Sequence, residues 1–101
     1  MPAFVVVDID VHDPVRYEDY KRLAEATVGA YGGRYVARGG RTAVLEGKWT
    51  PKRLVILEFE SVERARQWWD SPEYRPARAL RQATAHTSMV VVEGVAPSGG
   101  R

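Results

Sequence analysis

The chain has 101 residues, which fits a single domain, and 45% of them are hydrophobic, enough to form a compact core. Its 15 Lys and Arg against 13 Asp and Glu leave a formal net charge of only +2. The basic residues are dispersed along the chain, which argues against a nucleic-acid-binding face. The absence of Cys excludes disulfides, thiolate nucleophiles and zinc ribbons.

The N-terminus and the apolar stretches give no sign of membrane targeting. The opening residues lack a basic segment, and Asp8 and Asp10 interrupt the apolar run that follows, so we do not expect a signal peptide. No stretch approaches the roughly 20 apolar residues that span a bilayer. We therefore expect a soluble cytoplasmic protein without a membrane or nucleic-acid partner.

Two elements are predicted for the first third of the chain. Residues Ala3–Val11 alternate with period two and are rich in β-branched side chains, which predicts a strand. Asp13 as N-cap and Pro14 at the first helical position begin a helix. Aromatic and aliphatic residues then recur every three or four positions as far as Tyr31. Gly32 follows, where a left-handed residue commonly ends a helix.

The middle of the chain is predicted to form strands. Arg34–Arg38 and Ala43–Gly47 are short strands, and Gly39-Gly40 between them is either a tight hairpin turn or a bulge in one long bent strand. Arg53–Glu60 is a further strand, nearly all apolar in its first half. We therefore expect it to be central in a sheet and covered on both faces.

The last third combines helical segments with a final strand. Ser61 caps a helix that ends near Asp70, and Ser71-Pro72 begins a second helical segment that ends near Ala83. His86–Gly94 is the last strand. Because residues 96–101 are rich in Gly, Pro and Ser, we expect a disordered tail after a single domain of residues 1–95.

The order β-α-β-β-α-β predicts a ferredoxin-like α+β sandwich, with helices on one face of the sheet. The other face carries Phe4, Val6, one of Leu54 and Val55, and one of Val90 and Val91. Such a face is too apolar to stay in water. We therefore expect two copies to pack their sheets together as a homodimer.

Several short motifs, in a fixed order from residue 3 to residue 94, carry a family resemblance: Asp10-Val11-His12-Asp13-Pro14, Tyr31-Gly32-Gly33-Arg34-Tyr35, Arg38-Gly39-Gly40, Leu45-Glu46-Gly47, Ser71-Pro72-Glu73-Tyr74 and Val92-Glu93-Gly94. In this order the chain resembles a family of small bacterial proteins known as a domain of unknown function, within the dimeric α/β-barrel superfamily. The resemblance implies a ferredoxin-like protomer and a homodimer.

The same superfamily contains cofactor-free monooxygenases, haem-binding oxygenases and decarboxylases, and lactone isomerases, which usually bind their ligand between the sheet and the helices. That analogy concerns the fold, and a fold does not determine a function.

Carboxylates are the first candidates for chemistry. The first strand is predicted to lie next to Arg53–Glu60 and to run parallel to it, so Asp8 and Asp10 are expected to meet Glu58 and Glu60 at one sheet edge. Paired carboxylates raise one another's pKa and supply a general base. The alternative is that these residues are solvated strand ends or ion-pair partners of Arg34.

His12 and His86 form a second candidate. The last strand is predicted to run antiparallel to the first, which brings these two residues together near Asp10, where they suit a metal or acid–base role. The alternative is two exposed histidines at a strand end, and no HxH or HxxxH spacing favours a metal.

Arginines and tyrosines are the third group. Tyr74, Arg78 and Arg81 share a helical face, and Arg38 precedes Gly39-Gly40, so an organic anion has potential partners here. Tyr20 points its hydroxyl into the helix–sheet gap if that gap is hollow. The alternatives are arginines paired with the chain's own glutamates, Glu46 among them, and an aromatic stripe that is ordinary core.

These observations leave two hypotheses. One is a small cofactor-independent enzyme, isomerase or monooxygenase-like, that acts on a small organic anion or aromatic compound. The other is a non-catalytic homodimer that binds a small ligand or supports a partner. For the enzyme, the candidate catalytic residues are Asp8, Glu46 and Glu58, and the candidate ligand-binding residues are Tyr20, Arg38, Tyr74, Arg78 and Arg81, with no metal or cofactor expected.

Overall fold

The computed structural model describes residues 1–95, and the predicted tail of residues 96–101 lies outside them. Its elements are β1 (Ala3–Val11), α1 (Pro14–Ala30), β2 (Arg34–Arg38), β3 (Leu54–Phe59), α2 (Val62–Trp69), α3 (Arg75–Thr84) and β4 (Ala85–Glu93). The predicted β-α-β-β-α-β order is confirmed, with the last helical region divided into α2 and α3. Within residues 1–95, no helix is both long and apolar enough to cross a membrane.

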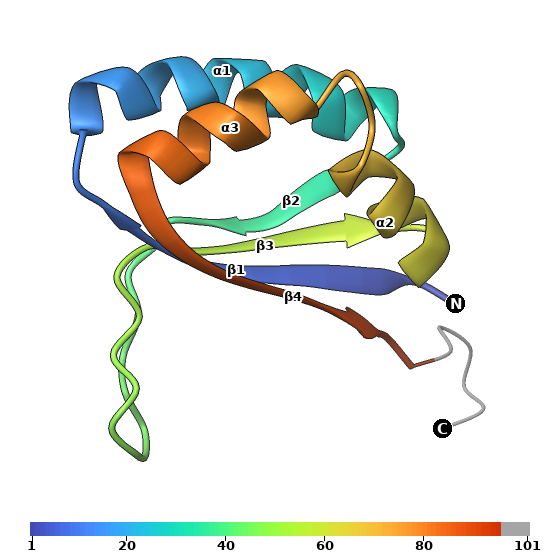
Figure 1. The fold of residues 1–101 in the computed structure, drawn as a ribbon. Helices are drawn as coiled ribbons and strands as arrows, with labels where there is room; N and C mark the ends of the chain where they lie inside the picture. Colours follow the sequence, from blue (N-terminus) through green and yellow to red (C-terminus); the bar gives the residue numbers. More distant parts are fainter. Residues whose placement is uncertain (96–101) are drawn as a thin grey trace.

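The four strands form one sheet in the order β2-β3-β1-β4, and every neighbouring pair is antiparallel. All three helices cover the same face of this sheet (Figure 1). The prediction that β1 and β3 run parallel is therefore wrong. Helix α1 returns the chain across the sheet, so β2 runs in the direction of β1, and the reversal after β2 turns β3 the opposite way. This is the ferredoxin-like α+β fold that the sequence predicts.

Both ends of α1 follow the predicted capping chemistry. The Asp13 carboxylate accepts a hydrogen bond from the backbone N–H of Arg16, 3.3 Å away. At the other end, Gly32 adopts a φ of 76°, and the N–H groups of Gly32 and Gly33 donate to the carbonyls of Gly29 and Val28. This pair of hydrogen bonds requires a residue in the left-handed backbone conformation, which glycine adopts without strain.

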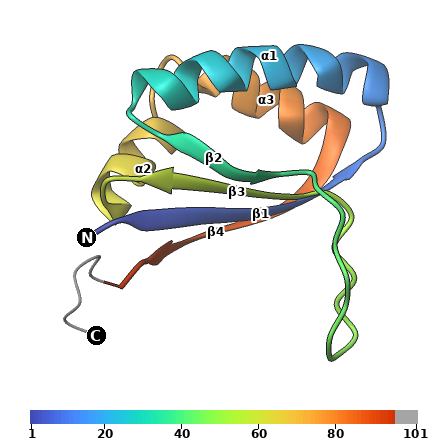
Figure 2. The same cartoon turned by 180° about the vertical axis from the view of Figure 1, so that it is seen from behind.

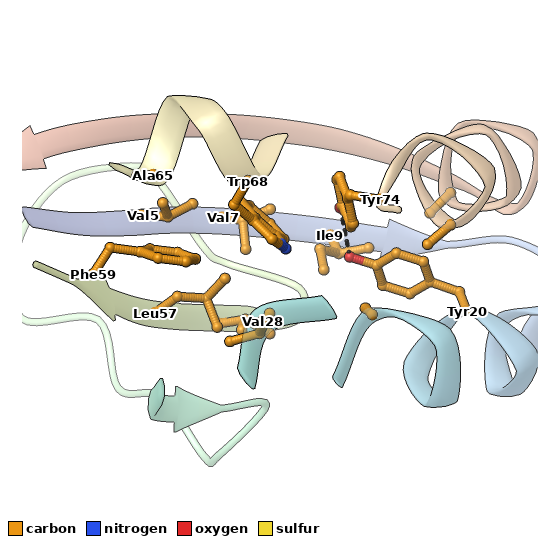
Figure 3. Packing of buried hydrophobic residues seen from close by; sticks show 14 of the residues in the cluster. Val5, Val7, Ile9, Tyr20, Val28, Leu57, Phe59, Ala65, Trp68 and Tyr74 are labelled. Carbon is orange, nitrogen blue, oxygen red and sulfur yellow. Dashed lines mark hydrogen bonds between the residues drawn. The ribbon is translucent and has the colours of Figure 1, made fainter. Parts of the chain in front are cut away.

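The core lies between the helices and one sheet face. Residues Val5, Val7 and Ile9 of β1 are buried there, and the indole of Trp68, 1% exposed, packs 5.2 Å from the Phe59 ring (Figure 3). The Trp68 indole N–H donates to the Thr27 hydroxyl at 3.0 Å, and this hydroxyl donates to the Ala24 carbonyl. The buried polar atoms of this contact are therefore paired, as a close-packed core requires.

The connection from α2 to α3 differs from the prediction. Residues 71–74 form a turn, and α3 begins at Arg75 rather than Pro72. The buried Ser71 hydroxyl donates to the Trp68 carbonyl at 2.8 Å and accepts from the Tyr74 N–H at 3.1 Å. A serine side chain that competes for backbone partners in this way favours a turn over a continued helix.

The segment between β2 and β3 also differs. Ala43–Gly47 is not a strand, and residues 39–53 form a long arm that projects from the sheet (Figure 1). Gly39-Gly40 is neither a tight turn nor a bulge, because the chain leaves the sheet there. The irregularity in the β2–β3 ladder lies between Tyr35 and Ala37 instead. Arm residues 39–50 are exposed, so burial gives them no reason to join the ladder.

The second sheet face has no helix over it. It presents Phe4, Val6 and Ile56, which are half-buried, and Val90 and Val92, which are 61% and 52% exposed. The expectation that β3 is covered on both faces therefore fails within one chain, since helices cover only the Val55, Leu57 and Phe59 side. Of the sequence's alternatives for this open face, Leu54 and Val90 are the ones that face it.

Candidate functional site

Two tyrosine hydroxyls meet in the interior between α1 and the start of α3. Tyr20 and Tyr74 are 8% and 0% exposed, and their hydroxyl oxygens lie 2.9 Å apart (Figure 3). Burial, and then the neighbouring Tyr74, raise the pKa of the Tyr20 hydroxyl well above its ordinary range. This hydroxyl is therefore neutral at physiological pH and acts as a hydrogen-bonding group rather than as a base.

Arg81 lies on the same face of α3, seven residues after Tyr74. The residue is only 4% exposed, and its Nε has no hydrogen-bond partner within residues 1–95. Arg81 also takes part in none of the ion pairs of the described chain. A guanidinium cannot lose its charge, so this is a buried cation without a carboxylate partner among residues 1–95.

A groove of about 650 Å³ opens beside Arg81, between α2, α3 and the edge strand β4. This volume is in the range of small-molecule sites. Its polar wall includes Arg81 and Thr87, and the Thr87 hydroxyl is likewise buried without a partner in the described chain. The apolar and aromatic wall consists of Val5, Ala65, Trp68, Trp69, Met89, Val90 and Val91.

The gap between α1 and the sheet is nearly filled. Its cavity measures only about 20 Å³, lined by Tyr17, Tyr20, Arg38 and Arg53 among others. That is room for about one water molecule. Trp68 and Met89 line both this cavity and the groove. The space for an organic ligand is therefore at the β4 edge rather than under α1.

The predicted carboxylate cluster does not form. Because β1 and β3 are antiparallel, Asp8 is opposite Leu54 while Glu58 is opposite Phe4, so the two acids lie at opposite ends of the strands. Glu58 instead pairs with Arg34 at 2.6 Å, which agrees with the alternative hypothesis of an ion pair with Arg34. Asp8 accepts hydrogen bonds from Trp49 and Lys52, and the Trp49 indole is the largest cause that lowers its pKa.

The other predicted arginines have partners within the described chain. Arg38 pairs with Glu25 at 3.2 Å and stacks 4.2 Å from the Tyr35 ring centroid, so Glu46 on the exposed arm is not its partner. Arg78 donates to the Trp69 carbonyl and covers the Trp69 ring at 4.1 Å. It holds one wall of the groove in place.

His12 and His86 do come together as predicted, with ring centroids 5.1 Å apart. Within residues 1–95, however, no cluster of three or more His, Asp or Glu residues is arranged to hold a metal ion. Both side chains are exposed at the sheet end. This geometry matches the alternative of two surface histidines.

The groove also contains residues that sequence reasoning missed. Thr87, Met89 and Val91 occupy every second position of β4 and face the helices, opposite Ile9, Val7 and Val5 of β1. The available signal was the hydroxyl of Thr87 at an inward position of a strand whose next two inward residues, Met89 and Val91, are apolar. Trp68 carried a clearer signal, as one of two adjacent indoles that cannot face the same way.

Comparison with solved structures supports the fold. A protein of unknown function from Rhodopseudomonas palustris, RPA0582, is 20% identical with a TM-score of 0.77, over 95% of this chain and 84% of that chain. SnoaB, a cofactor-independent oxygenase from Streptomyces nogalater, is 14% identical with a TM-score of 0.66, over 97% of each chain. A dimeric ferredoxin-like protein of unknown function from Jannaschia sp. CCS1 is 12% identical with a TM-score of 0.70, over 93% of this chain and all of that chain.

At these identities the likeness concerns the fold alone. No curated protein sequence matches this chain. The family model is the more specific finding, and it confirms the resemblance that the sequence motifs carry. Because the model described as Domain of unknown function (DUF1330) matches residues 2–95, nearly the whole chain, the protein belongs to that family.

Proposed function

We propose that this protein is a small enzyme, independent of a cofactor, that acts on a small organic anion with an aromatic or apolar body held in the groove beside Arg81. The observation that carries the proposal is the buried Arg81 guanidinium, whose Nε has no partner within the described chain. A planar carboxylate fits this fork with charge-assisted hydrogen bonds, and it would neutralise the buried charge.

The remaining groove walls support the same ligand class. Trp68 and Met89 offer aromatic and thioether surface for a flat ring, and the unpartnered Thr87 hydroxyl offers one further hydrogen bond. A groove that combines an apolar wall with polar side chains, Arg66, Asp70 and Gln82 among them, can both bury and orient a small molecule. Asp8, Glu46 and Glu58 do not line the groove, so the proposal gives them no catalytic part.

The reaction class is proposed from the fold neighbour. SnoaB is described as a cofactor-independent oxygenase and has this fold over nearly its whole length. We therefore favour monooxygenase-like or isomerase chemistry over hydrolysis. The alternative is a protein that binds the same ligand without converting it. It is favoured because Asp70, the carboxylate among the described groove residues, is already within ion-pair distance of Arg75 and Arg78.

We propose further that two copies form a homodimer through the open sheet face. Phe4, Val6, Ile56, Val90 and Val92 make that face apolar, and the Jannaschia neighbour is described as dimeric. Apolar surface of this extent on an uncovered sheet is typical of an interface.

The test measures ligand binding and turnover separately. Benzoate, salicylate and 2,5-dihydroxybenzoate are titrated into the protein by calorimetry, with Arg81→Met as the variant and Arg75→Met as the control. Arg75 is exposed and lies on the same helix. We expect at least one of these acids to bind, with Arg81→Met weakening it tenfold or more and Arg75→Met changing it less than twofold. Equal binding by all three proteins would overturn the site.

Turnover is followed with an oxygen electrode and by mass spectrometry of the products. Oxygen uptake or a rearranged product that depends on the protein, and that Arg81→Met abolishes, supports the enzyme. Binding without any product from every acid that binds would replace it with the non-catalytic alternative.

A further inference from the structure

The arm formed by residues 39–53 carries large apolar side chains into water. Leu45 is 97% exposed, Trp49 is 60% exposed and Val44 is 47% exposed. Both views show the arm projecting from one end of the sheet on the side opposite the helices (Figures 1 and 2). Apolar side chains gathered on a protruding segment favour a contact that removes them from water.

The arm is held in a defined direction. The Trp49 indole N–H donates to one Asp8 carboxylate oxygen at 2.9 Å, and the Lys52 backbone N–H donates to the other at 2.9 Å. At its base, the Gly39 N–H donates to the Leu54 carbonyl at 2.9 Å. An arm fixed before association loses less conformational freedom when it meets a partner.

The position of the arm indicates which partner it meets. Asp8 lies on the open face of β1, in register with Leu54 on one side and Ser88 on the other, so the arm is anchored to that face. The apolar residues of the open face and those of the arm therefore lie on the same side of the sheet. A body that covers the open face also lies beside the arm.

We infer that the arm of each copy packs against the second copy of this chain, so that Leu45 and Val44 are buried at the dimer contact. This inference rests on the homodimer proposed above and adds a second contact region to it. A dimer with a two-fold axis uses the same surface twice, so two arms hold the two sheets together. Such a reciprocal contact lowers the dissociation rate more than it changes the folding of either chain.

The first test is the dimer dissociation constant, measured by sedimentation equilibrium for the wild type, Leu45→Asp and Val15→Asp. Val15 is the matched control, since it is 80% exposed and lies on α1, over the opposite face of the sheet. We expect Leu45→Asp to raise the dissociation constant at least tenfold and Val15→Asp to change it less than twofold. At dilutions where all three proteins are monomers, the wild type and both variants should share one thermal unfolding midpoint.

The second test uses the absence of native cysteine. Leu45→Cys and Val15→Cys are labelled with an environment-sensitive fluorophore and diluted through the dissociation range. A red shift on dilution at residue 45 and none at residue 15 supports the arm contact. A wild-type dimer with an unchanged constant in Leu45→Asp would overturn the arm while leaving the homodimer intact. A wild type that stays at 11.3 kDa throughout would overturn both.

Discussion

At the scale of single residues, the Tyr20–Tyr74 pair and Arg81 differ in whether their buried polar atoms have hydrogen-bond partners. The two tyrosine hydroxyls satisfy each other inside the core at 2.9 Å. The Arg81 Nε is as well buried and finds no partner in the described chain. A buried charge without a partner destabilises a fold, and this cost is the reason we propose a ligand in the groove beside it.

Arg81→Met is accordingly expected to weaken binding of the organic acid while the stability of the fold stays the same or increases. Methionine fills a similar volume without a charge to desolvate, so the free energy of unfolding should stay constant or rise by about 1 kcal/mol. Urea unfolding measures this value, with Arg75→Met as the surface control. A loss of more than about 2 kcal/mol would mean that Arg81 is a structural residue with partners in its own fold.

Tyr20→Phe is expected to destabilise the protein by about 1–3 kcal/mol, because it leaves the buried Tyr74 hydroxyl without its tyrosine partner. Tyr20→Phe combined with Tyr74→Phe should cost less than the sum of the single changes, since neither hydroxyl then remains. Denaturant unfolding of the three variants closes this cycle. Additive losses would show that the 2.9 Å contact contributes nothing of its own.

The Tyr20 pKa also predicts how stability depends on pH. Burial raises this pKa in the folded chain, so the folded state disfavours the tyrosinate. The contribution is fully present below the unfolded value near 10 and is lost as the pH rises above it. We expect tyrosinate absorbance at 295 nm from Tyr20 to appear only as the chain unfolds in alkali. In Tyr20→Phe that absorbance step should be smaller by one tyrosine.

At the scale of elements, the junction of α1 and β2 is packed without spare room. A Cβ placed on Gly33 would approach the Phe59 ring to 2.6 Å, and this ring is 1% exposed. Gly33→Ala should therefore cost about 1–3 kcal/mol through overpacking. Thermal unfolding measures this, with Gly29→Ala as the control because its Cβ meets open space. Equal midpoints for the two variants would contradict the packing at this junction.

The arm depends on the charge of Asp8. The Trp49 indole, with backbone N–H groups, lowers the pKa of this carboxyl below its ordinary value of 3.8. The anchoring is therefore present above pH 3.8 and is lost as the pH falls through the lower folded value. Asp8→Asn should loosen the arm at neutral pH. The measurement is hydrogen exchange of the Lys52 amide, which should become faster in Asp8→Asn and unchanged in Asp10→Asn.

At the scale of the whole molecule, one face of the sheet is covered by helices and the other face is uncovered. The helices bury one side, while Val90 and Val92 on the other remain more than half exposed. A domain of this length buries a limited share of its surface by itself, so a second copy is the natural source of further burial.

Val90→Asp is expected to shift the protein toward monomer. A charge buried between two packed sheets loses its hydration without a partner, which should raise the dimer dissociation constant tenfold or more. Light scattering over a dilution series measures it, beside Val15→Asp on the helical side. If Val90→Asp keeps the mass of the wild-type dimer, the open face is not the contact.

Local chemistry explains what the sequence alone determined. Period-two alternation placed β1 at Ala3–Val11, and the Asp13-Pro14 and Gly32 signals placed both ends of α1. The order of elements then led to the ferredoxin-like fold, and the ordered motifs led to the family. These properties depend on neighbours within a few residues, so local sequence patterns predict them.

Only the tertiary structure decided the site. The direction of β3 relative to β1 separates Asp8 from Glu58, and that direction depends on how the chain reverses after β2 rather than on either strand's residues. The same holds for Arg81 and Thr87, which meet at one groove because α3 packs beside β4. The arm replaces the expected strand Ala43–Gly47, since its residues are exposed and gain no burial from joining the sheet ladder. Long-range packing determines each of these outcomes, and local sequence patterns do not predict that packing.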